Sequence, residues 1–244
     1  MLRLENVYKD FSGLEVLSGI SLEIKKGERH AIIGTNGAGK STVFNVITGL
    51  YKPSSGRIFF LDQNITGWPI HRIALLGLVR SLQITTIFPT MTVFENIRNA
   101  VVSKFNRRFN FTSLLSRSKE IRRECDRILE WLRLGDFRDV PACELSYGWQ
   151  RRLEVALTLA LDPLLILLDE PTAGIDVKET LTFVEFMKET TEGKTLVIVE
   201  HDMDVVFDIS DRVTVLNDGK VLLTGTVDVI RENKEVQKAY AGRK

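Results

Sequence analysis

The sequence has no hydrophobic run long enough to cross a membrane. Its most apolar stretches, 73–79 and 164–168, are far shorter than the roughly 18 residues that suggest a spanning helix. It has no signal peptide, and its two cysteines, Cys125 and Cys143, lack the spacing of a zinc site or a redox motif. These absences fit a protein of the reducing cytoplasm, and if the protein works at a membrane, another chain must span it.

An excess of charge of either sign is also missing. The 33 basic and 32 acidic residues leave a formal net charge of +1. No bulk field that would attract nucleic acid or an anionic membrane is therefore expected, and any phosphate must be bound locally. With 244 residues, 44% of them hydrophobic, the chain can bury a full core, and its composition excludes disorder and a disulfide scaffold.

Apolar runs alternate with helical patterns along much of the chain, which favours an α/β fold with a mostly parallel sheet. Residues 69–139 are instead dominated by helical periodicity and predict an inserted helical subdomain. Asn217-Asp218-Gly219 predicts a hairpin turn. Strands are predicted at 2–7, 21–24, 30–33, 57–61, 164–168, 195–199, 212–216 and 220–224, and helices at 39–48, 147–160, 178–192 and 228–240.

A glycine-rich segment, Gly34-Thr35-Asn36-Gly37-Ala38-Gly39-Lys40-Ser41, lies between a predicted strand and a predicted helix. It matches the phosphate-binding pattern G-x-x-x-x-G-K-[ST]. Glycines let the backbone N–H groups face a β-phosphate, and the helix start adds a positive field. Lys40 can reach the β- and γ-phosphates, Ser41 can bind Mg²⁺, and Thr42 can bond a phosphate. The alternative is a plain glycine-rich turn.

Two carboxylates, Asp169 and Glu170, directly follow the apolar run 164–168. They stand at the carboxyl end of a predicted strand, where α/β sheets bind their ligands. Asp169 can complete a Mg²⁺ shell with Ser41, and Glu170 can accept a hydrogen bond from a water that attacks the γ-phosphate. The alternative is a helix cap or a solvated turn before Pro171.

With further motifs in the expected order, the chain resembles the nucleotide-binding subunits of ABC transporters over essentially its whole length. Residues 145–150, Leu-Ser-Tyr-Gly-Trp-Gln, are similar to the family's signature sequence, and residues 173–176, Ala-Gly-Ile-Asp, to its D-loop. The resemblance implies a P-loop NTPase core of the RecA-like type, an N-terminal antiparallel β subdomain and an inserted α-helical subdomain. Residues 1–83 and 150–244 would form the nucleotide-binding core with the β subdomain, and 84–149 the helical signature subdomain.

The resemblance also implies roles for single residues. His201 would be the switch histidine, which contacts the γ-phosphate and orients Glu170 or the water. Gln83 would sense the metal and the nucleotide, as a ligand of Mg²⁺, and Phe11 would stack on adenine. Taken alone, these three would be a structural histidine, a surface glutamine and a core aromatic.

Other implied roles belong to a dimer. Ser146 is placed to cap the helix that follows, whose N-terminus is an anion site. In the family this site contacts the γ-phosphate on the other subunit, so Ser146 and Gly148 would complete a composite site across a two-fold axis. Asp176 would meet the opposite phosphate loop, or would simply cap a helix. Trp149 departs from the polar residue usual in the family and puts a side-chain hydrogen bond from that position in doubt.

The segments 88–97 and 200–203 are most similar to ATP-binding subunits of branched-chain amino acid importers. Transporters of urea or short amides share much of this pattern, and the ATPase of lipopolysaccharide export is more distant. The resemblance implies ATP hydrolysis with ATP and Mg²⁺, and transmembrane permease partners that dock near residues 84–95. It also implies a second ABC ATPase subunit, identical or homologous, and a peripheral position on the cytoplasmic face of the inner membrane.

Two competing functions come from other classes. A soluble ABC-type ATPase acting on ribosomes or DNA is disfavoured by the single cassette, the near-neutral charge and the lack of a basic or coiled-coil extension, so no nucleic-acid partner is expected. An ATP-dependent dimerisation module that does not hydrolyse is disfavoured by the combination of Glu170 and His201.

Overall fold

The computed structural model describes residues 1–81, 87–108 and 114–241. Contacts between residues divide the chain into two compact units. The sheet unit consists of Met1–Arg80, Leu164–Pro171 and Gly193–Lys244, and the helical unit of Ser81–Pro163 and Thr172–Glu192. Each unit is therefore built from segments that lie far apart in the sequence.

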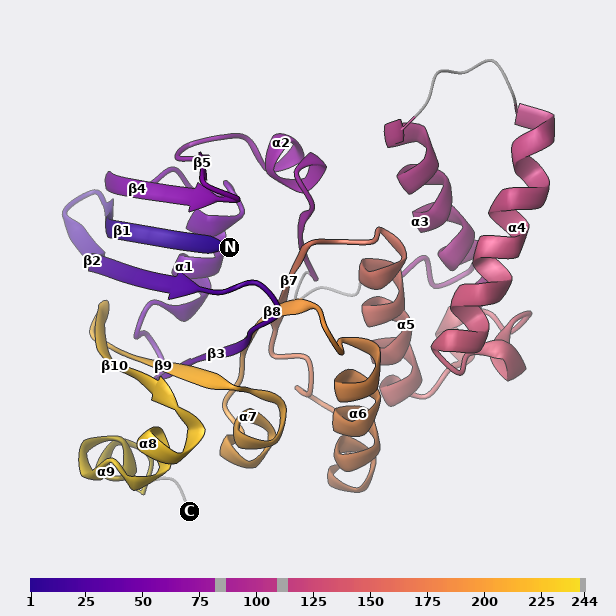
Figure 1. Ribbon diagram of the computed structural model, residues 1–244. Helices are drawn as coiled ribbons and strands as arrows, with labels where there is room; N and C mark the ends of the chain where they lie inside the picture. Colours follow the sequence, from indigo (N-terminus) through magenta and orange to yellow (C-terminus); the bar gives the residue numbers. More distant parts are fainter. Residues whose placement is uncertain (82–86, 109–113, 242–244) are drawn as a thin grey trace. The chain divides into compact units, whose positions relative to one another are not determined.

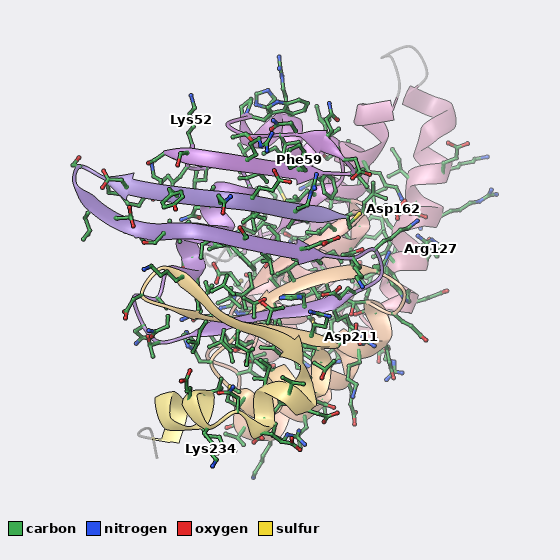
Figure 2. All side chains as sticks on the ribbon, turned by 60° about the vertical axis from the view of Figure 1, so that its left-hand side comes forward. Lys52, Phe59, Arg127, Asp162, Asp211 and Lys234 are labelled. Carbon is green, nitrogen blue, oxygen red and sulfur yellow. The ribbon has the colours of Figure 1, made fainter. Side chains whose placement is uncertain are left out.

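The sheet unit begins with an antiparallel sheet in the strand order β2-β1-β4-β5 (Figure 1). Alternating burial along β1 directs apolar side chains to one face of this sheet. Phe59 lies on the opposite face, where the guanidinium groups of Arg3 and Arg57 are 4.6 and 5.7 Å from its ring centre (Figure 2). The strands are β1 (Leu2–Phe11), β2 (Leu14–Ile24), β4 (Ser55–Phe60) and β5 (Gln63–Asn64).

A second sheet of the same unit has the strand order β10-β9-β3-β8-β7-β6. All neighbouring pairs are parallel except β9 and β10, which form an antiparallel hairpin. Every residue of β7 and β8 is buried, as expected for parallel strands covered on both faces. The strands are β3 (Arg29–Gly34), β6 (Leu78–Arg80), β7 (Leu165–Asp169), β8 (Thr195–Val199), β9 (Arg212–Asn217) and β10 (Lys220–Thr226).

Helix α1 (Lys40–Ile47) joins the two sheets into one hydrophobic core. Its buried residues, among them Phe44 and Ile47, pack in a single cluster with side chains of both sheets, such as Phe60 of β4 and Leu167 of β7. This packing holds the start of α1, and with it the loop after β3, in a fixed place.

A buried chain of polar side chains links β3 to the strands beside it. His30 Nδ1 lies 2.7 Å from Glu28 Oε1, and His30 Nε2 lies 2.7 Å from Thr214 Oγ1. Thr214 Oγ1 is in turn 2.8 Å from Thr224 Oγ1 of β10. Burial raises the pKa of Glu28, but hydrogen bonds from His30 and from the Lys25 N–H outweigh burial and hold that pKa below its ordinary value. These hydrogen bonds therefore link β3 to β9 and β10, the two strands of the hairpin.

The helical unit is built mainly on four helices. Helix α3 packs against α4 and α5, and α5 also packs against α6. Helix α3 begins with a capping box, in which Thr92 Oγ1 accepts from the Glu95 N–H at 3.1 Å and Glu95 Oε2 accepts from the Thr92 N–H at 2.9 Å. The helices are α3 (Val93–Arg108), α4 (Leu114–Trp131), α5 (Tyr147–Ala160) and α6 (Val177–Thr190), with short 3₁₀ turns at Gly135–Phe137 and Ala142–Glu144.

The remaining helices belong to the sheet unit, and two of them correct the sequence analysis. The single helix predicted at 228–240 is two helices, α8 (Val227–Glu232) and α9 (Lys234–Ala241), because Asn233 ends the first and its Oδ1 accepts from two N–H groups of the second. Helices α2 (Ile70–Leu75) and α7 (Met203–Ile209) are also present, and α7 was not predicted.

The prediction that residues 69–139 form an inserted helical subdomain is wrong at β6, which is a strand of the sheet unit. This strand of three residues follows Gly77, whose φ of 97° ends the preceding turn, and it pairs in parallel with β7. Three residues are too few to give a period-2 pattern, so the sequence carries no local signal for it. The predicted fold class, an α/β fold with a mostly parallel sheet and an N-terminal antiparallel sheet, is confirmed.

The helical unit starts at Ser81, close to the predicted start of the signature subdomain at residue 84, but it also takes in α5 and α6. A unit defined by packing and a subdomain defined by function need not coincide, so the division at 84–149 stays a prediction. Within the described residues, each helix is too short or too polar to span a membrane.

Candidate functional site

The predicted phosphate loop lies between β3 and α1, as the sequence indicates. Gly37 and Gly39 have φ angles of 81° and 97°, which residues with a side chain rarely adopt. Gly34 ends β3 against the Leu216 carbonyl of β9, so that a Cβ there would collide with the backbone of the neighbouring strand. The glycines of this segment therefore meet steric demands of the loop itself.

Lys40 is the first residue of α1, and its side chain turns back over the loop. Its Nζ donates to the carbonyl oxygens of Gly34 at 2.8 Å and Thr35 at 3.1 Å, and the residue is buried. Ser41 is exposed and Thr42 half-buried in the first turn of the same helix. An ammonium and two hydroxyl groups thus gather at a helix N-terminus, which carries a partial positive charge and binds phosphate groups.

The two acidic residues have different surroundings. The Asp169 side chain, at the end of β7, is fully buried, whereas that of Glu170 is 29% exposed. Glu170 has a φ of 49°, and its N–H donates to the Val199 carbonyl of β8 at 2.8 Å. This left-handed backbone turns the chain sharply at the carboxyl edge of the sheet and sends the two carboxylates in different directions.

Asp169 forms a buried ion pair with Arg80 of β6. Arg80 Nη2 donates to Asp169 Oδ2 at 2.6 Å, and Asp169 Oδ1 has no hydrogen-bond partner in the described part of the chain. Burial raises the pKa of Asp169, although Arg80 and Lys40 oppose that shift. Arg80 was not predicted as a site residue, because β6 has no local sequence signal and only its pairing with β7 brings Arg80 to Asp169.

His201 and Glu170 are brought together by parallel strands. His201 Nε2 lies 2.5 Å from Glu170 Oε1, and the two residues follow the neighbouring strands β8 and β7. The role given to His201, to orient Glu170 or the water, stays a prediction, and this contact is compatible with it. A carboxylate held by an imidazole, partly exposed beside a phosphate-binding loop, can accept a proton from a water molecule.

The signature segment lies in the helical unit. Ser146 occupies the N-cap position of α5, but its hydroxyl makes no capping hydrogen bond, so the expectation of a side-chain cap is wrong. The Ser146 side chain therefore does not satisfy the first N–H groups of α5, and N–H groups at a helix start can bind an anion. Gly148 lies in the first turn, against the Glu179 carboxylate. Trp149 packs on Phe137, with ring centres 4.4 Å apart.

The remaining predicted site residues are Asp176, Phe11 and Gln83, which belong to different parts of the chain. Asp176 caps α6, since its Oδ1 accepts from the Lys178 N–H at 2.8 Å, so the helix-cap alternative holds for the isolated chain. Phe11 ends β1, is 38% exposed and contacts Tyr51 edge-on at 5.3 Å, so it is not a core aromatic. Gln83 lies outside the described residues.

The residues present fit a magnesium ion bound together with a nucleotide. Across the described ranges, no three His, Cys, Asp or Glu side chains gather as a metal site. Mg²⁺ in nucleotide sites is typically held by one or two carboxylates, with phosphates and water completing its shell. The buried Asp169 carboxylate, whose Oδ1 has no partner among the described residues, and the Ser41 hydroxyl match that ligand set.

The fold and the loop define a P-loop nucleoside triphosphatase. The sequence profile described as ABC transporter matches residues 17–173. The chain is 39% identical to the high-affinity branched-chain amino acid transport ATP-binding protein LivG of Escherichia coli strain K12, over 99% of this chain and 98% of the relative. It is 38% identical to the corresponding protein BraF of Pseudomonas aeruginosa, over 99% and 98%.

Solved structures of similar fold are also ATP-binding cassettes of ABC transporters. A crystal structure of the ADP conformation of an ATP-binding cassette of an ABC transporter matches with a TM-score of 0.84 and 29% identity, covering all of this chain and 99% of that one. The dimeric structure of a bacterial ABC transporter cassette matches with a TM-score of 0.74 and 28% identity, over 93% and 99%. The chain belongs to the ABC transporter family, and it is an ATP-binding subunit that hydrolyses ATP.

Proposed function

We propose that the chain energises an importer of branched-chain amino acids. The relatives that are 38–39% identical over nearly the whole chain carry that function in their names, as does a probable LivG of Archaeoglobus fulgidus at 35% identity. The observation that carries the hydrolytic part is the contact of His201 with Glu170 at the same sheet edge as the phosphate loop. Together they support a transport ATPase rather than a binding module.

In the proposed reaction, the loop N–H groups, Lys40 and Thr42 bind the phosphates of ATP, with Asn36 and Ala38 as part of the loop. Glu170 accepts a proton from the attacking water, whose oxygen bonds to the γ-phosphorus while the bond from that phosphorus to the β,γ-bridging oxygen breaks, so that ADP and phosphate are released. His201 contacts the γ-phosphate and orients Glu170 or the water. Mg²⁺, held by Ser41, Gln83 and Asp169, would offset the negative charge on the phosphate oxygens. Phe11, exposed beside Tyr51, stacks on the adenine ring.

The active form is proposed to be a two-fold dimer with ATP between the subunits. Ser146 and Gly148 contact the γ-phosphate bound by the other subunit, and Asp176 meets the opposite phosphate loop. The absence of a side-chain cap from Ser146 at the N-terminus of α5 and the dimeric cassette of similar fold support this arrangement. The partner is a second copy or a homologous ATPase subunit.

The subunit is proposed to sit on the cytoplasmic face of the inner membrane and to touch it only through permease subunits. The helical signature subdomain, residues 84–149, receives a permease helix near residues 84–95. Phe88 and Met91 of this segment are 51% and 37% exposed, which suits a surface that binds another protein. No nucleic acid is expected as a partner.

The catalytic assignment is tested with Glu170→Gln and Lys40→Ala. Glu170→Gln keeps MgATP binding and lowers turnover by about a hundredfold or more, because the proton acceptor is lost. Lys40→Ala instead weakens ATP binding itself. Steady-state hydrolysis and binding of a fluorescent ATP analogue separate the two effects. Near-normal turnover of Glu170→Gln would overturn the assignment of Glu170.

The transport assignment is tested by recovering the tagged chain from gently solubilised membranes of its source. Multi-span membrane proteins and a second ABC subunit are expected to co-purify. The recovered complex, reconstituted in liposomes with MgATP inside, is expected to transport leucine, isoleucine or valine. Transport of a urea or a short amide instead would move the subunit to a neighbouring branch, and recovery with ribosomes or DNA would remove it from transport.

A further inference from the structure

The guanidinium of Arg80 joins three elements of the sheet unit. Nη2 donates to Asp169 Oδ2 of β7 at 2.6 Å, and Nη1 donates to Asn45 Oδ1 of α1, also at 2.6 Å. Arg80 itself belongs to β6, where it pairs with Leu167. One planar group thus connects the helix that follows the phosphate loop with the strand that carries the acidic pair.

The residues around Arg80 hold its guanidinium in place. The Arg80 side chain is 9% exposed and that of Asp169 is 0% exposed. The guanidinium also lies 5.4 Å from the centre of the Phe44 ring, on the same helix as Asn45. Buried on a short strand and held by two hydrogen bonds, the fork has few alternative positions.

This contact makes the two oxygens of Asp169 unequal. Oδ2 is bound by Arg80, whereas Oδ1 is buried and has no partner among the described residues. A buried carboxylate oxygen without a partner is unfavourable unless something binds it. The arrangement leaves one lone oxygen of fixed direction, which is the requirement for a ligand that binds a cation through a single atom.

We propose that Arg80 is a positioning residue, which orients the Asp169 carboxylate so that Oδ1 is presented to Mg²⁺ while Asn45 locks the guanidinium. This inference rests on the proposed role of Asp169 as a magnesium ligand. Groups that hydrogen-bond a metal ligand typically change metal affinity by about 10- to 100-fold when they are removed.

A purely electrostatic role predicts the opposite sign. The guanidinium is positively charged, and its charge repels a cation bound to the same carboxylate. If charge alone mattered, Arg80→Met would strengthen Mg²⁺ binding and Arg80→Lys would leave it unchanged. If orientation matters, both variants weaken it, because lysine keeps the charge but cannot form the planar fork to Asp169 and Asn45 together.

The test is the affinity for a fluorescent ATP analogue, measured by anisotropy in a Mg²⁺ titration and again in EDTA. Arg80→Lys and Arg80→Met are expected to raise the Mg²⁺ concentration for half-maximal enhancement by about tenfold, with affinity in EDTA within about twofold of the unchanged protein. Arg57→Lys, an exposed arginine of β4, is the matched control and is expected to behave as the unchanged protein.

The outcomes distinguish a failure of the positioning role of Arg80 from a failure of the metal role of Asp169. Tighter or unchanged Mg²⁺ dependence in both Arg80 variants would overturn the positioning role, as would an equal loss of affinity in EDTA and in Mg²⁺. Asp169→Asn is run beside them. If it keeps the full Mg²⁺ enhancement, the proposed metal role of Asp169 fails; if it loses the enhancement while the Arg80 variants keep it, only the role of Arg80 fails. Arg80→Lys preserves the charge and serves where Arg80→Met does not fold.

Discussion

Two carboxylates next to each other in the sequence acquire different properties because the backbone turns between them. Asp169 ends a buried strand and is paired with Arg80, whereas Glu170, at a φ of 49°, reaches a partly exposed edge and meets His201. Holding a residue other than glycine in this region costs about 1–3 kcal/mol. The surrounding sheet offsets this cost and keeps the two side chains apart, so that Asp169 is suited to bind a metal and Glu170 to accept a proton.

The two cysteines give a prediction at the same scale. Cys125 is fully buried, and burial, with a smaller effect of Asp126, raises the pKa of its thiol to about 11. Cys143 is exposed. Iodoacetamide at pH 8 is therefore expected to add one group to the folded protein, at Cys143, and a second only after unfolding, because alkylation requires an accessible thiolate.

Intact-mass spectrometry follows the adducts, and the variant Cys143→Ser is the control that should take none while folded. Labelling of Cys125 at a rate close to that of Cys143 would show that the core around α4 opens far more readily than its packing implies.

Single residues also mark the limit of what the sequence predicts. Lys40, Asp169 and Glu170 stand out because they belong to patterns of adjacent residues with known chemistry. Arg80 does not, since its partner Asp169 is 89 residues away and only sheet pairing brings them together. Ser146 shows the converse: its type and position predict a cap, yet the hydroxyl makes no such bond.

Among the elements, strands buried on both faces were the easiest to predict. The runs that became β7 and β8 are continuously apolar because parallel strands are covered on both sides. Helix α5 was predicted with its observed bounds. By contrast, β6 has three residues, and burial does not alternate along the first half of β2, so neither shows a periodic pattern. Their positions follow from pairing with distant strands.

Helix α3 offers a test at this scale. Its capping box satisfies N–H groups at the start of the helix, and the buried Asn96 amide binds the Phe88 and Met91 carbonyls of the segment before it. Thr92→Ala is expected to lower the free energy of unfolding by about 1 kcal/mol, since one cap is lost.

Urea denaturation measures the change. Thr90→Ala, at an exposed threonine two residues earlier, is the matched control and is expected to change stability by less than about 0.5 kcal/mol. Equal effects of the two substitutions would mean that the capping box contributes nothing to the stability of α3.

For the molecule as a whole, the proposed dimer predicts a change of mass with nucleotide. Glu170→Gln with MgATP is expected to shift from monomer to dimer, because the bound γ-phosphate joins the N-terminus of α5 of one subunit to the loop of the other. ADP should not cause the shift. Multi-angle light scattering after gel filtration measures it.

Lys40→Ala combined with Glu170→Gln is the control and should stay monomeric at the same nucleotide concentration. If the chain works only with a homologous sister, Glu170→Gln alone stays monomeric and dimerises once that sister is added. A protein that remains monomeric under both conditions would contradict the composite site.

The strand order of the larger sheet also determines when the support of the phosphate loop can form during synthesis of the chain. Strand β3, which ends in the phosphate loop, has β8 and β9 as its two neighbours, and these come at 195–199 and 212–217. The antiparallel sheet, by contrast, lies wholly within the first 64 residues. As the chain leaves the ribosome from its N-terminus, this small sheet can form before the phosphate loop has its completed support, because that support requires synthesis to reach β9. A ribosome that stalls before β9 would therefore release a fragment with the sequence of a nucleotide site but without its framework.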